Sequence, residues 1–110
     1  MSDKLSSFVG LAMRAGKIVS GSLPVEKALN AKKALVLLID ESISENSLSA
    51  YKTLAERNGI AVLIMKEGTL CAAIGKPGRM AAAVTEQGFA KQILKLASEA
   101  GLHIIGGVCN

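Results

Sequence analysis

Aromatic side chains are scarce in this chain of 110 residues, which contains one tyrosine, two phenylalanines and no tryptophan. Many proteins that read single-stranded nucleic acids or RNA motifs stack bases on rows of aromatic rings. A chain with so few rings cannot build such a row. The composition therefore excludes an aromatic stacking platform, although half of the residues are apolar and can fill the core of one domain.

Residues that carry catalysis or hold metals are also few. His103 is the single histidine and lies in an apolar segment, and the two cysteines, Cys71 and Cys109, have no metal-binding spacing. Two distant thiols in apolar surroundings suit a reducing compartment better than a disulfide framework. No apolar run approaches a membrane span, and the N-terminus lacks an apolar signal region. We therefore expect a cytoplasmic protein that needs no metal or cofactor.

A phosphate-binding loop is missing as well. The segment Gly75–Gly78 matches neither GxxxxGK[ST] nor GxGxxG, and it precedes an expected strand instead of following one. Asp40 and Glu41 end another expected strand, where open α/β sheets place active sites. These carboxylates can equally support the start of the next helix through its dipole. A small enzyme with a site near Asp40 and Glu41 thus remains an alternative.

Alternating strand and helix patterns dominate the sequence. The continuous apolar runs at 34–39 and 60–65 are typical of strands buried on both faces. Consecutive buried strands need crossover connections, so we expect an α/β fold with helices on both faces of one sheet. The expected helices lie within about 3–14, 24–33, 42–58, 68–74 and 85–101, and the expected strands cover 17–19, 34–39, 60–65 and 80–84.

The helix starts and the C-terminal tail lead to more specific expectations. Ser42 and Glu45 form a capping-box pattern, Thr85 can cap the last helix, and Pro24 suits a first helical turn. The tail 102–110 is apolar and could add an edge strand, cover a neighbour or stay disordered. We therefore expect a domain over 1–101 followed by a separate tail. Pairing through the tail would make the chain an assembly module, which is a second alternative.

Positive charge gathers in two blocks that are distant in sequence. Residues 1–33 hold six basic and two acidic side chains, and residues 66–110 hold five and three. Residues 34–65 hold two basic and four acidic side chains, and the formal net charge of the whole chain is +4. A basic surplus of this kind favours a polyanionic partner.

The segment from Ser20 to Lys27 has the pattern of an anion-binding helix start. Gly21 permits the close approach of another backbone, and the helix start supplies unpaired N–H groups. Lys27 follows about one turn later and can meet a phosphate. An ordinary capped helix with Lys27 in solvent explains the same spacing, so the residues alone leave both interpretations open.

The run Gly10–Gly21, GLAMRAGKIVSG, resembles the opening of the YlxQ-like bacterial branch of the L7Ae/L30e ribosomal protein family. The similarity continues through Leu35–Ile39, Asn58–Ile60, Ala72–Lys76, Ala83–Thr85 and Gly88–Lys91, and it covers about residues 4–97. The resemblance implies a single-domain, three-layer α/β/α sandwich whose central mixed sheet has about four strands. It also implies a non-catalytic protein that binds kinked, internally looped RNA, typically the kink-turn.

In that family, a Gly-x-Asn-Glu-x-x-Lys motif at a helix start and the loop before the last strand hold the RNA. Gly21 and Lys27 match the ends of the motif, whereas Leu23 and Pro24 replace Asn and Glu. Leucine has no polar group and proline lacks a backbone donor, so phosphate docking is better preserved than base recognition. The resemblance thus implies an RNA-binding set of Gly21, Ser22, Leu23, Lys27, Lys76, Pro77, Gly78, Arg79 and Met80, assisted by Arg14 and Lys17.

The expected partner is structured RNA, either ribosomal RNA or another RNA that contains a kink-turn. We expect the chain to act as a monomer, away from membranes, and the ribosomal character of the family makes association with the ribosome a natural expectation. No cofactor is needed for this role.

Overall fold

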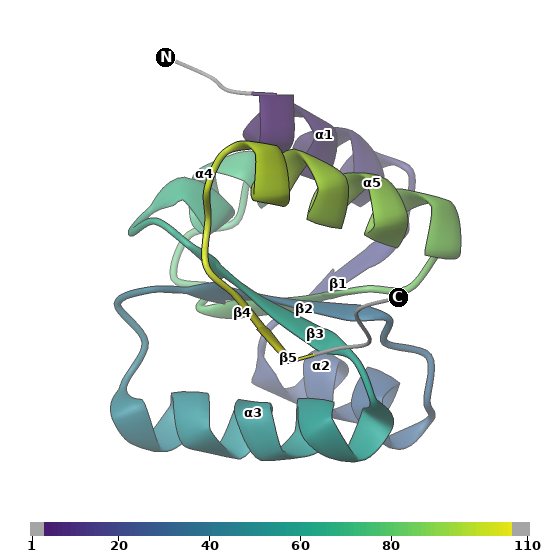
Figure 1. Ribbon diagram of the computed structural model, residues 1–110, viewed down its shortest axis with the longest axis vertical. Helices are drawn as coiled ribbons and strands as arrows, with labels where there is room; N and C mark the ends of the chain where they lie inside the picture. Colours follow the sequence, from purple (N-terminus) through teal and green to yellow (C-terminus); the bar gives the residue numbers. More distant parts are fainter. Residues whose placement is uncertain (1–3, 107–110) are drawn as a thin grey trace.

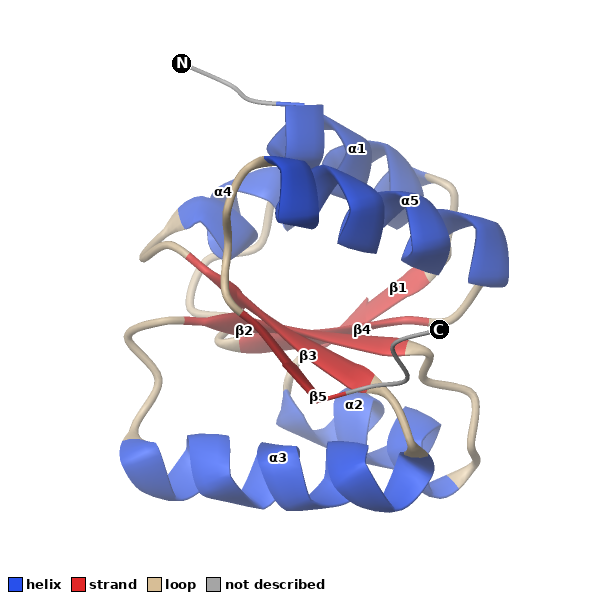
Figure 2. Cartoon of the chain, viewed as in Figure 1, coloured by secondary structure: helices blue, strands red, loops and turns tan. Residues whose placement is uncertain are grey.

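The computed structural model describes residues 4–106, in which helices and strands alternate (Figure 1). Helices α1, α4 and α5 cover one face of the sheet, and α2 and α3 cover the other (Figure 2). The implied three-layer α/β/α sandwich is therefore confirmed. The elements are α1 (Lys4–Arg14), β1 (Ile18–Ser20), α2 (Ser22–Asn30), β2 (Val36–Asp40), α3 (Glu45–Asn58), β3 (Ala61–Met65), α4 (Thr69–Ile74), β4 (Ala81–Val84), α5 (Gln87–Glu99) and β5 (Ile104–Gly106).

The sheet is mixed, with the strand order β1-β4-β2-β3-β5. Strands β2 and β3 are parallel, and β4 runs antiparallel to both β1 and β2. The ends of β1, β2 and β3 therefore lie beside the start of β4, at what we term the carboxyl end of the sheet. The opposite end, where β1, β2 and β3 begin and β4 stops, is termed the amino end.

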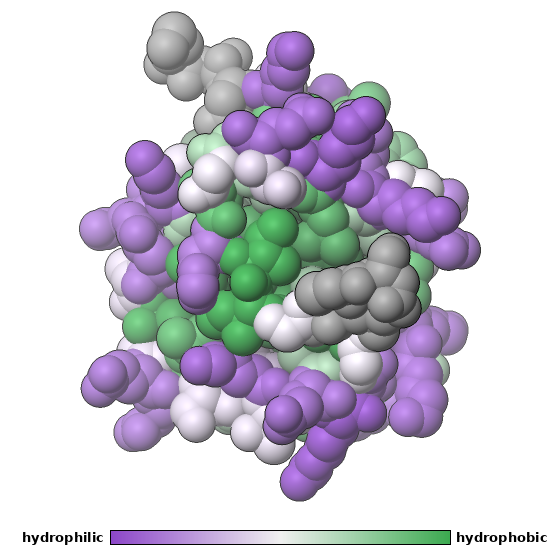
Figure 3. Space-filling view, viewed as in Figure 1, coloured by the Kyte–Doolittle hydropathy of each residue, from purple (hydrophilic) through white to green (hydrophobic). Residues whose placement is uncertain are grey.

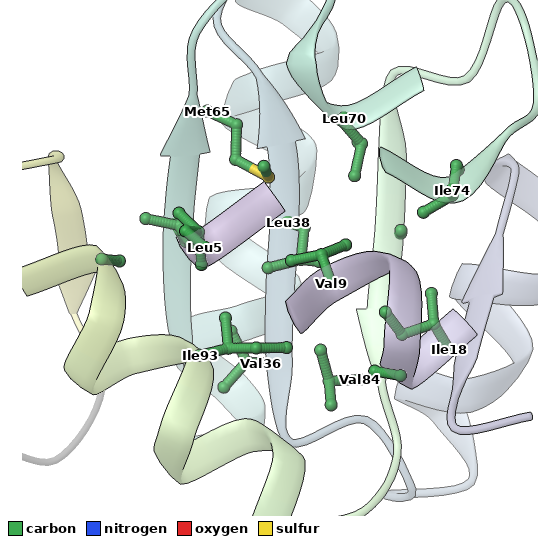
Figure 4. Close-up of a cluster of buried hydrophobic side chains, with 14 of the residues drawn as sticks. Leu5, Val9, Ile18, Val36, Leu38, Met65, Leu70, Ile74, Val84 and Ile93 are labelled. Atoms are coloured by element: carbon green, nitrogen blue, oxygen red, sulfur yellow. The ribbon is translucent and has the colours of Figure 1, made fainter. Parts of the chain in front are cut away.

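Two hydrophobic clusters hold the layers together, one on each face of the sheet. Val9 and Ile93 pack on the same face as Leu38 (Figure 4), whereas Leu37 packs against Tyr51 on the other face. Neighbouring residues of β2 thus serve opposite cores, as expected for a strand that is buried throughout. Each large aliphatic side chain removed from water stabilises the fold by roughly 1.5–3 kcal/mol, so this sheet is a rigid support for the loops at its ends.

The sheet has five strands instead of about four because Ile104–Gly106 pair with β3 as the antiparallel strand β5. The sequence left open whether the tail adds an edge strand, covers a neighbour or stays disordered. Its first part, up to Gly106, adds an edge strand. Residues 107–110 lie outside the described residues. On the face seen in Figure 3, hydrophobic side chains show near β5, between hydrophilic side chains that cover the outer helical layers.

The predicted capping box at Ser42 was wrong. Helix α3 is capped by Ser44, whose hydroxyl accepts the Ser47 N–H at 3.2 Å. Ser42 instead donates both its N–H and its hydroxyl to the carboxylate of Asp40, at 2.8 and 2.6 Å. Both donors of Ser42 thus go to the buried carboxylate of Asp40, which keeps Ser42 in the turn after β2, and helix α3 begins only after Ser44.

The predicted cap at Thr85 was also wrong. Glu86 caps α5 by accepting the Phe89 N–H at 2.7 Å, and the Thr85 hydroxyl donates to the Lys17 carbonyl at 3.1 Å. Thr85 therefore extends the pairing of β1 with β4. Pro24 does lie in the first turn of α2, where its missing N–H leaves no bond unmade.

Candidate nucleic-acid interface

A groove of about 420 Å³ opens at the carboxyl end of the sheet. Three connections form its walls: the β1–α2 turn, the β2–α3 loop and the α4–β4 loop. The groove, termed the carboxyl-end groove, is lined by Gly21, Ser22, Ser42, Ile43, Ser44, Ser47, Tyr51, Gly78, Arg79, Met80 and Ala81. The fold thus joins the helix start and the loop before β4, which the resemblance named as separate parts.

Gly21 is the point where these two parts touch. Its φ of 93° and ψ of 155° fall in a region that is essentially restricted to glycine. Its N–H donates to the Ala81 carbonyl at 3.1 Å, which ties the turn to the start of β4. A Cβ built at this position would lie 2.7 Å from Nη1 of Arg79. The backbone angles therefore require glycine, and any side chain here would also have to displace the guanidinium that rests on it.

Arg79 is a half-buried cation in the lining of the groove. Its Nε is buried and has no hydrogen-bond partner within residues 4–106, while its carbonyl accepts the Cys71 thiol at a distance of 3.0 Å from Sγ. A buried donor without a partner costs free energy until an acceptor arrives. The Cys71 thiol thus fixes the backbone of Arg79, and within the described part of the chain the Nε of its guanidinium lacks the acceptor that a bound anionic or carbonyl oxygen would supply.

The start of α2 offers further donors beside Arg79. Gly21 is its N-cap and provides no side-chain hydrogen bond, so the first N–H groups of the helix are not capped. Uncapped N–H groups and the positive end of the helix dipole attract anions. Ser22, which is exposed, adds a hydroxyl to the same wall of the groove.

Several expected residues lie outside the groove lining. Leu23 is 66% exposed on α2, and Lys27 lies in the last turn of that helix. Lys76 and Pro77 are exposed in the α4–β4 loop. These four exposed residues therefore do not shape the groove.

The two assisting residues lie at the other end of the sheet. Arg14 ends α1 and Lys17 precedes β1, whose register places Ile18 beside Val84 at the end of β4. The structure thus separates Arg14 and Lys17 from the groove by the length of β1.

The β2–α3 wall of the groove was missed by reasoning from the sequence. It contributes the hydroxyls of Ser42, Ser44 and Ser47 together with Ile43 and Tyr51. Burial, with the charge of Glu26 as a second cause, raises the pKa of Tyr51 above its ordinary 10.0, so its hydroxyl stays protonated at neutral pH. The cluster of serines between 42 and 49 was the available signal, but its position opposite Arg79 depends on the strand order.

Asp40 supports this wall from within. Its side chain is 1% exposed, and it accepts hydrogen bonds from Ser42 and from the Gly68 N–H, the latter at 2.9 Å. Burial alone would raise the pKa of Asp40, but these hydrogen bonds outweigh burial and hold the pKa below 3.8. Asp40 therefore orients Ser42, whose Oγ lies 3.7 Å from the sulfur of Met80 across the groove.

The carboxylates of Asp40 and Glu41 both accept backbone N–H groups from the turn after β3. Glu41 accepts the Glu67 N–H at 2.8 Å, so both side chains join the end of β2 to the turn after β3. Within 4–106, no three His, Cys, Asp or Glu residues are placed to share a metal ion. No helix in that range is both long and apolar enough to cross a membrane. Both carboxylates thus make structural hydrogen bonds, and that of Asp40 is also buried.

Comparison with known proteins finds relatives in sequence and a solved structure with a similar fold. An RNA-binding protein YlxQ of Bacillus subtilis (strain 168) is 38% identical over 92 residues, which cover 80% of this chain and 89% of that protein. An RNA-binding protein YlxQ of Enterococcus faecium is 29% identical over 95 residues, covering 86% and 91%. A solved structure of a protein with unknown function from Bacillus halodurans C has a TM-score of 0.84 at 23% identity, covering 88% of this chain and 99% of that one. This last likeness concerns the fold alone.

The family comparison covers most of the described chain. Residues 3–94 match the model of the Ribosomal protein L7Ae/L30e/S12e/Gadd45 family. Neither this family description nor the names of the two sequence relatives describes an enzyme, in agreement with the expectation of a non-catalytic protein. The resemblance at Gly10–Gly21 is thereby confirmed, and the chain belongs to the Ribosomal protein L7Ae/L30e/S12e/Gadd45 family, with YlxQ-like relatives.

Proposed function

We propose that this protein is a non-catalytic RNA-binding domain that docks kinked or internally looped RNA into the carboxyl-end groove. The observation that carries the proposal is the contact between Gly21 and Arg79, which joins the helix start and the loop before β4 in one groove. Membership of a ribosomal protein family and two relatives named RNA-binding proteins support it.

Phosphate docking relies on the start of α2 and on nearby cations. The uncapped N–H groups after Gly21 bind a phosphate oxygen, and Lys27 meets the next phosphate along the outer face of α2. Lys76 adds charge from the α4–β4 loop. These contacts fix the position of the RNA without reading its bases.

Recognition of the kink relies on the groove itself. A straight duplex keeps its bases stacked inside, whereas a kinked or looped RNA presents base edges and a sharply turned backbone. The guanidinium of Arg79, which lines the groove, donates to such an acceptor, and the serine hydroxyls on the facing wall donate or accept as needed. Leu23, 66% exposed on α2, and Met80, 41% exposed in the groove lining, provide apolar contact in place of aromatic rings.

The RNA is ribosomal or another RNA that contains a kink-turn-like element. The protein binds it in the cytoplasm as a monomer, and it reaches the ribosome where that RNA is part of the ribosome. No metal or cofactor takes part in this binding.

A titration of the wild type and Lys27→Ala against a kink-turn RNA and a straight duplex tests the proposal. The experiment is repeated between about 50 and 200 mM salt, because affinity that depends on phosphate contacts falls steeply over that range. We expect preference for the kinked RNA and a loss of about 1 kcal/mol for Lys27→Ala, if Lys27 makes one phosphate contact. Lys95→Ala, which removes an exposed charge from α5 in the other helical layer, is the matched control.

Two results would contradict the proposal. Equal affinity of the wild type for both RNAs would rule out recognition of structured RNA. Absence of measurable binding to either RNA at low salt would rule out RNA as the partner.

A further inference from the structure

A second group of basic residues lies at the amino end of the sheet, away from the carboxyl-end groove. Val84, at the end of β4, pairs with Ile18 on one side and with Val36 on the other. The connections that precede β1 and β2 therefore flank the end of β4, about 10 Å apart at two strand spacings. They contribute four basic residues, Arg14, Lys17, Lys32 and Lys33, which we term the amino-end basic surface.

The charges of this surface are not neutralised by the rest of the described chain. All four side chains are exposed, and none forms an ion pair with a carboxylate of residues 4–106. Neither 14–17 nor 32–35 contains an acidic residue. Glu86 is the acidic residue that follows β4 at this end; its carboxylate accepts the N–H of Phe89 at 2.7 Å, and it leaves a net surplus of positive charge among these five side chains.

Lys32 has a backbone conformation that its side chain does not favour. Its φ is 58°, and every other described residue with positive φ is a glycine. The N–H groups of Lys32 and Lys33 donate to the Leu29 and Ala28 carbonyls, at 3.1 and 2.8 Å, which is the pattern of a Schellman motif. Glycine is the preferred residue at the left-handed position of that motif. Fold stability alone would thus select glycine at position 32, whereas the sequence keeps a positive charge there.

Helix α2 connects the two ends of the sheet. It starts at the groove with Ser22, carries Lys27 in its last turn and ends just before Lys32. Its nine residues span about 13 Å at 1.5 Å per residue. One phosphate backbone that follows α2 from the groove would therefore meet Lys27 first and then the amino-end basic surface.

We propose that the amino-end basic surface binds the phosphates of the duplex stem that continues from the RNA element held in the groove. This inference rests on the proposed function and adds a second contact region for the same RNA. Lys32 and Lys33 bind the phosphates from the connection before β2. Arg14 and Lys17 add positive charge from the connection before β1.

The variant Lys32→Gly separates this role from a purely structural one. Glycine relieves the left-handed strain, so we expect Lys32→Gly to unfold at a higher denaturant concentration than the wild type. At the same time, we expect about a fivefold weaker affinity for a kinked RNA with a long stem, and a salt slope smaller by about one. Lys33→Gln should weaken binding similarly without the gain in stability, and Lys95→Gln should change neither quantity.

A second RNA, cut back close to the kink on the stem side, tests where the contact lies. For this RNA, Lys32→Gly and the wild type should bind equally, because the phosphates that reach Lys32 are missing. Unchanged affinity of Lys32→Gly for the long-stem RNA, or the same loss with both RNAs, would overturn the inference while leaving the groove proposal intact. A lower stability of Lys32→Gly would overturn the strain argument. Failure of the wild type to bind either RNA would instead contradict the proposed function.

Discussion

The guanidinium of Arg79 rests on the backbone of Gly21, so closely that a Cβ at position 21 would lie 2.7 Å from Nη1. This relationship joins the first and third connections between strands, because Gly21 follows β1 and Arg79 precedes β4. The two strands are neighbours in the sheet, and their antiparallel pairing sets the end of one beside the start of the other. The groove is thus a direct consequence of the strand order.

Gly21→Ala tests how much the fold depends on this close approach. Alanine at φ 93° and ψ 155° is strained, and its methyl group must displace Arg79. We expect a loss of about 1–3 kcal/mol in the free energy of unfolding, together with weaker binding of kinked RNA because Arg79 moves. Chemical denaturation followed by circular dichroism, and an RNA titration of the same sample, measure the two effects.

Gly59→Ala is the matched control for this substitution. Gly59 also has a positive φ, 66°, but a Cβ there would meet nothing within 4 Å. Gly59→Ala should lower the free energy of unfolding by only ~1 kcal/mol, through left-handed backbone strain, and its RNA affinity should be unchanged. Equal losses of stability in the two variants, with Gly21→Ala binding normally, would show that the contact with Arg79 matters for neither property.

The hydrogen bonds of Asp40 predict a stability that depends on acid pH. Because the folded-state pKa lies below the unfolded value of 3.8, ionised Asp40 stabilises the fold fully above about pH 5. This contribution is lost as the pH falls through the lowered folded-state pKa. Asp40→Asn should therefore lower the free energy of unfolding at neutral pH by about 2–3 kcal/mol, and it should flatten the decline below about pH 5.

Glu41→Gln provides the comparison for the Asp40 variant. Glu41 also accepts a backbone N–H, that of Glu67 at 2.8 Å, but it is exposed. Exposed hydrogen bonds to charged groups contribute little, so we expect a change below about 0.5 kcal/mol. Denaturant unfolding of the wild type, Asp40→Asn and Glu41→Gln between acid and neutral pH measures these differences. If the free energy of unfolding varied with pH in parallel for the wild type and Asp40→Asn, the role given to Asp40 would be contradicted.

The central strands could be predicted from the sequence because a short, continuous apolar run is typical of a strand buried on both faces. The apolar runs of β2 and β3 must be buried on both faces, so their place at the centre of the sheet follows from hydrophobicity. β5 could not be assigned, because Ile104–Gly106 becomes a strand only through pairing with β3. Short edge strands depend on a partner that is remote in sequence.

The candidate site also contains features that a local sequence pattern predicts and features that depend on residues remote in sequence. Gly21 and the loop around Arg79 were predicted through the resemblance, because their residue types match a motif. Ser42 was assigned to a helix cap, since the sequence does not reveal that Asp40 is buried and competes for its donors. Arg14 and Lys17 were expected to assist the RNA-binding set that includes Gly21, and they are close to Gly21 in sequence, but β1 separates them from it. Proximity in sequence is a poor guide to proximity in space across an extended strand.

The substitution Leu23→Asn tests whether base recognition can be strengthened at position 23, where the family motif has asparagine. Leu23 is 66% exposed, so its replacement should barely change stability. The amide adds a donor and an acceptor for a base edge, and such a contact discriminates by about 1–3 kcal/mol when both bonds form. We therefore expect affinity for a kink-turn RNA to rise by about 1 kcal/mol, roughly fivefold. Affinity for a straight duplex and the salt slope should stay constant, because the charge is unchanged.

Leu23→Ala is the control that separates a gained amide from a lost aliphatic side chain. It removes the exposed apolar surface without adding a polar group, so it should not gain affinity for the kinked RNA. If Leu23→Ala improved binding as much as Leu23→Asn, bulk at position 23 would be the obstacle instead of missing polarity. If Leu23→Asn improved binding to duplex and kinked RNA alike, the amide would contact the backbone, and the carboxyl-end groove would position RNA without reading its bases.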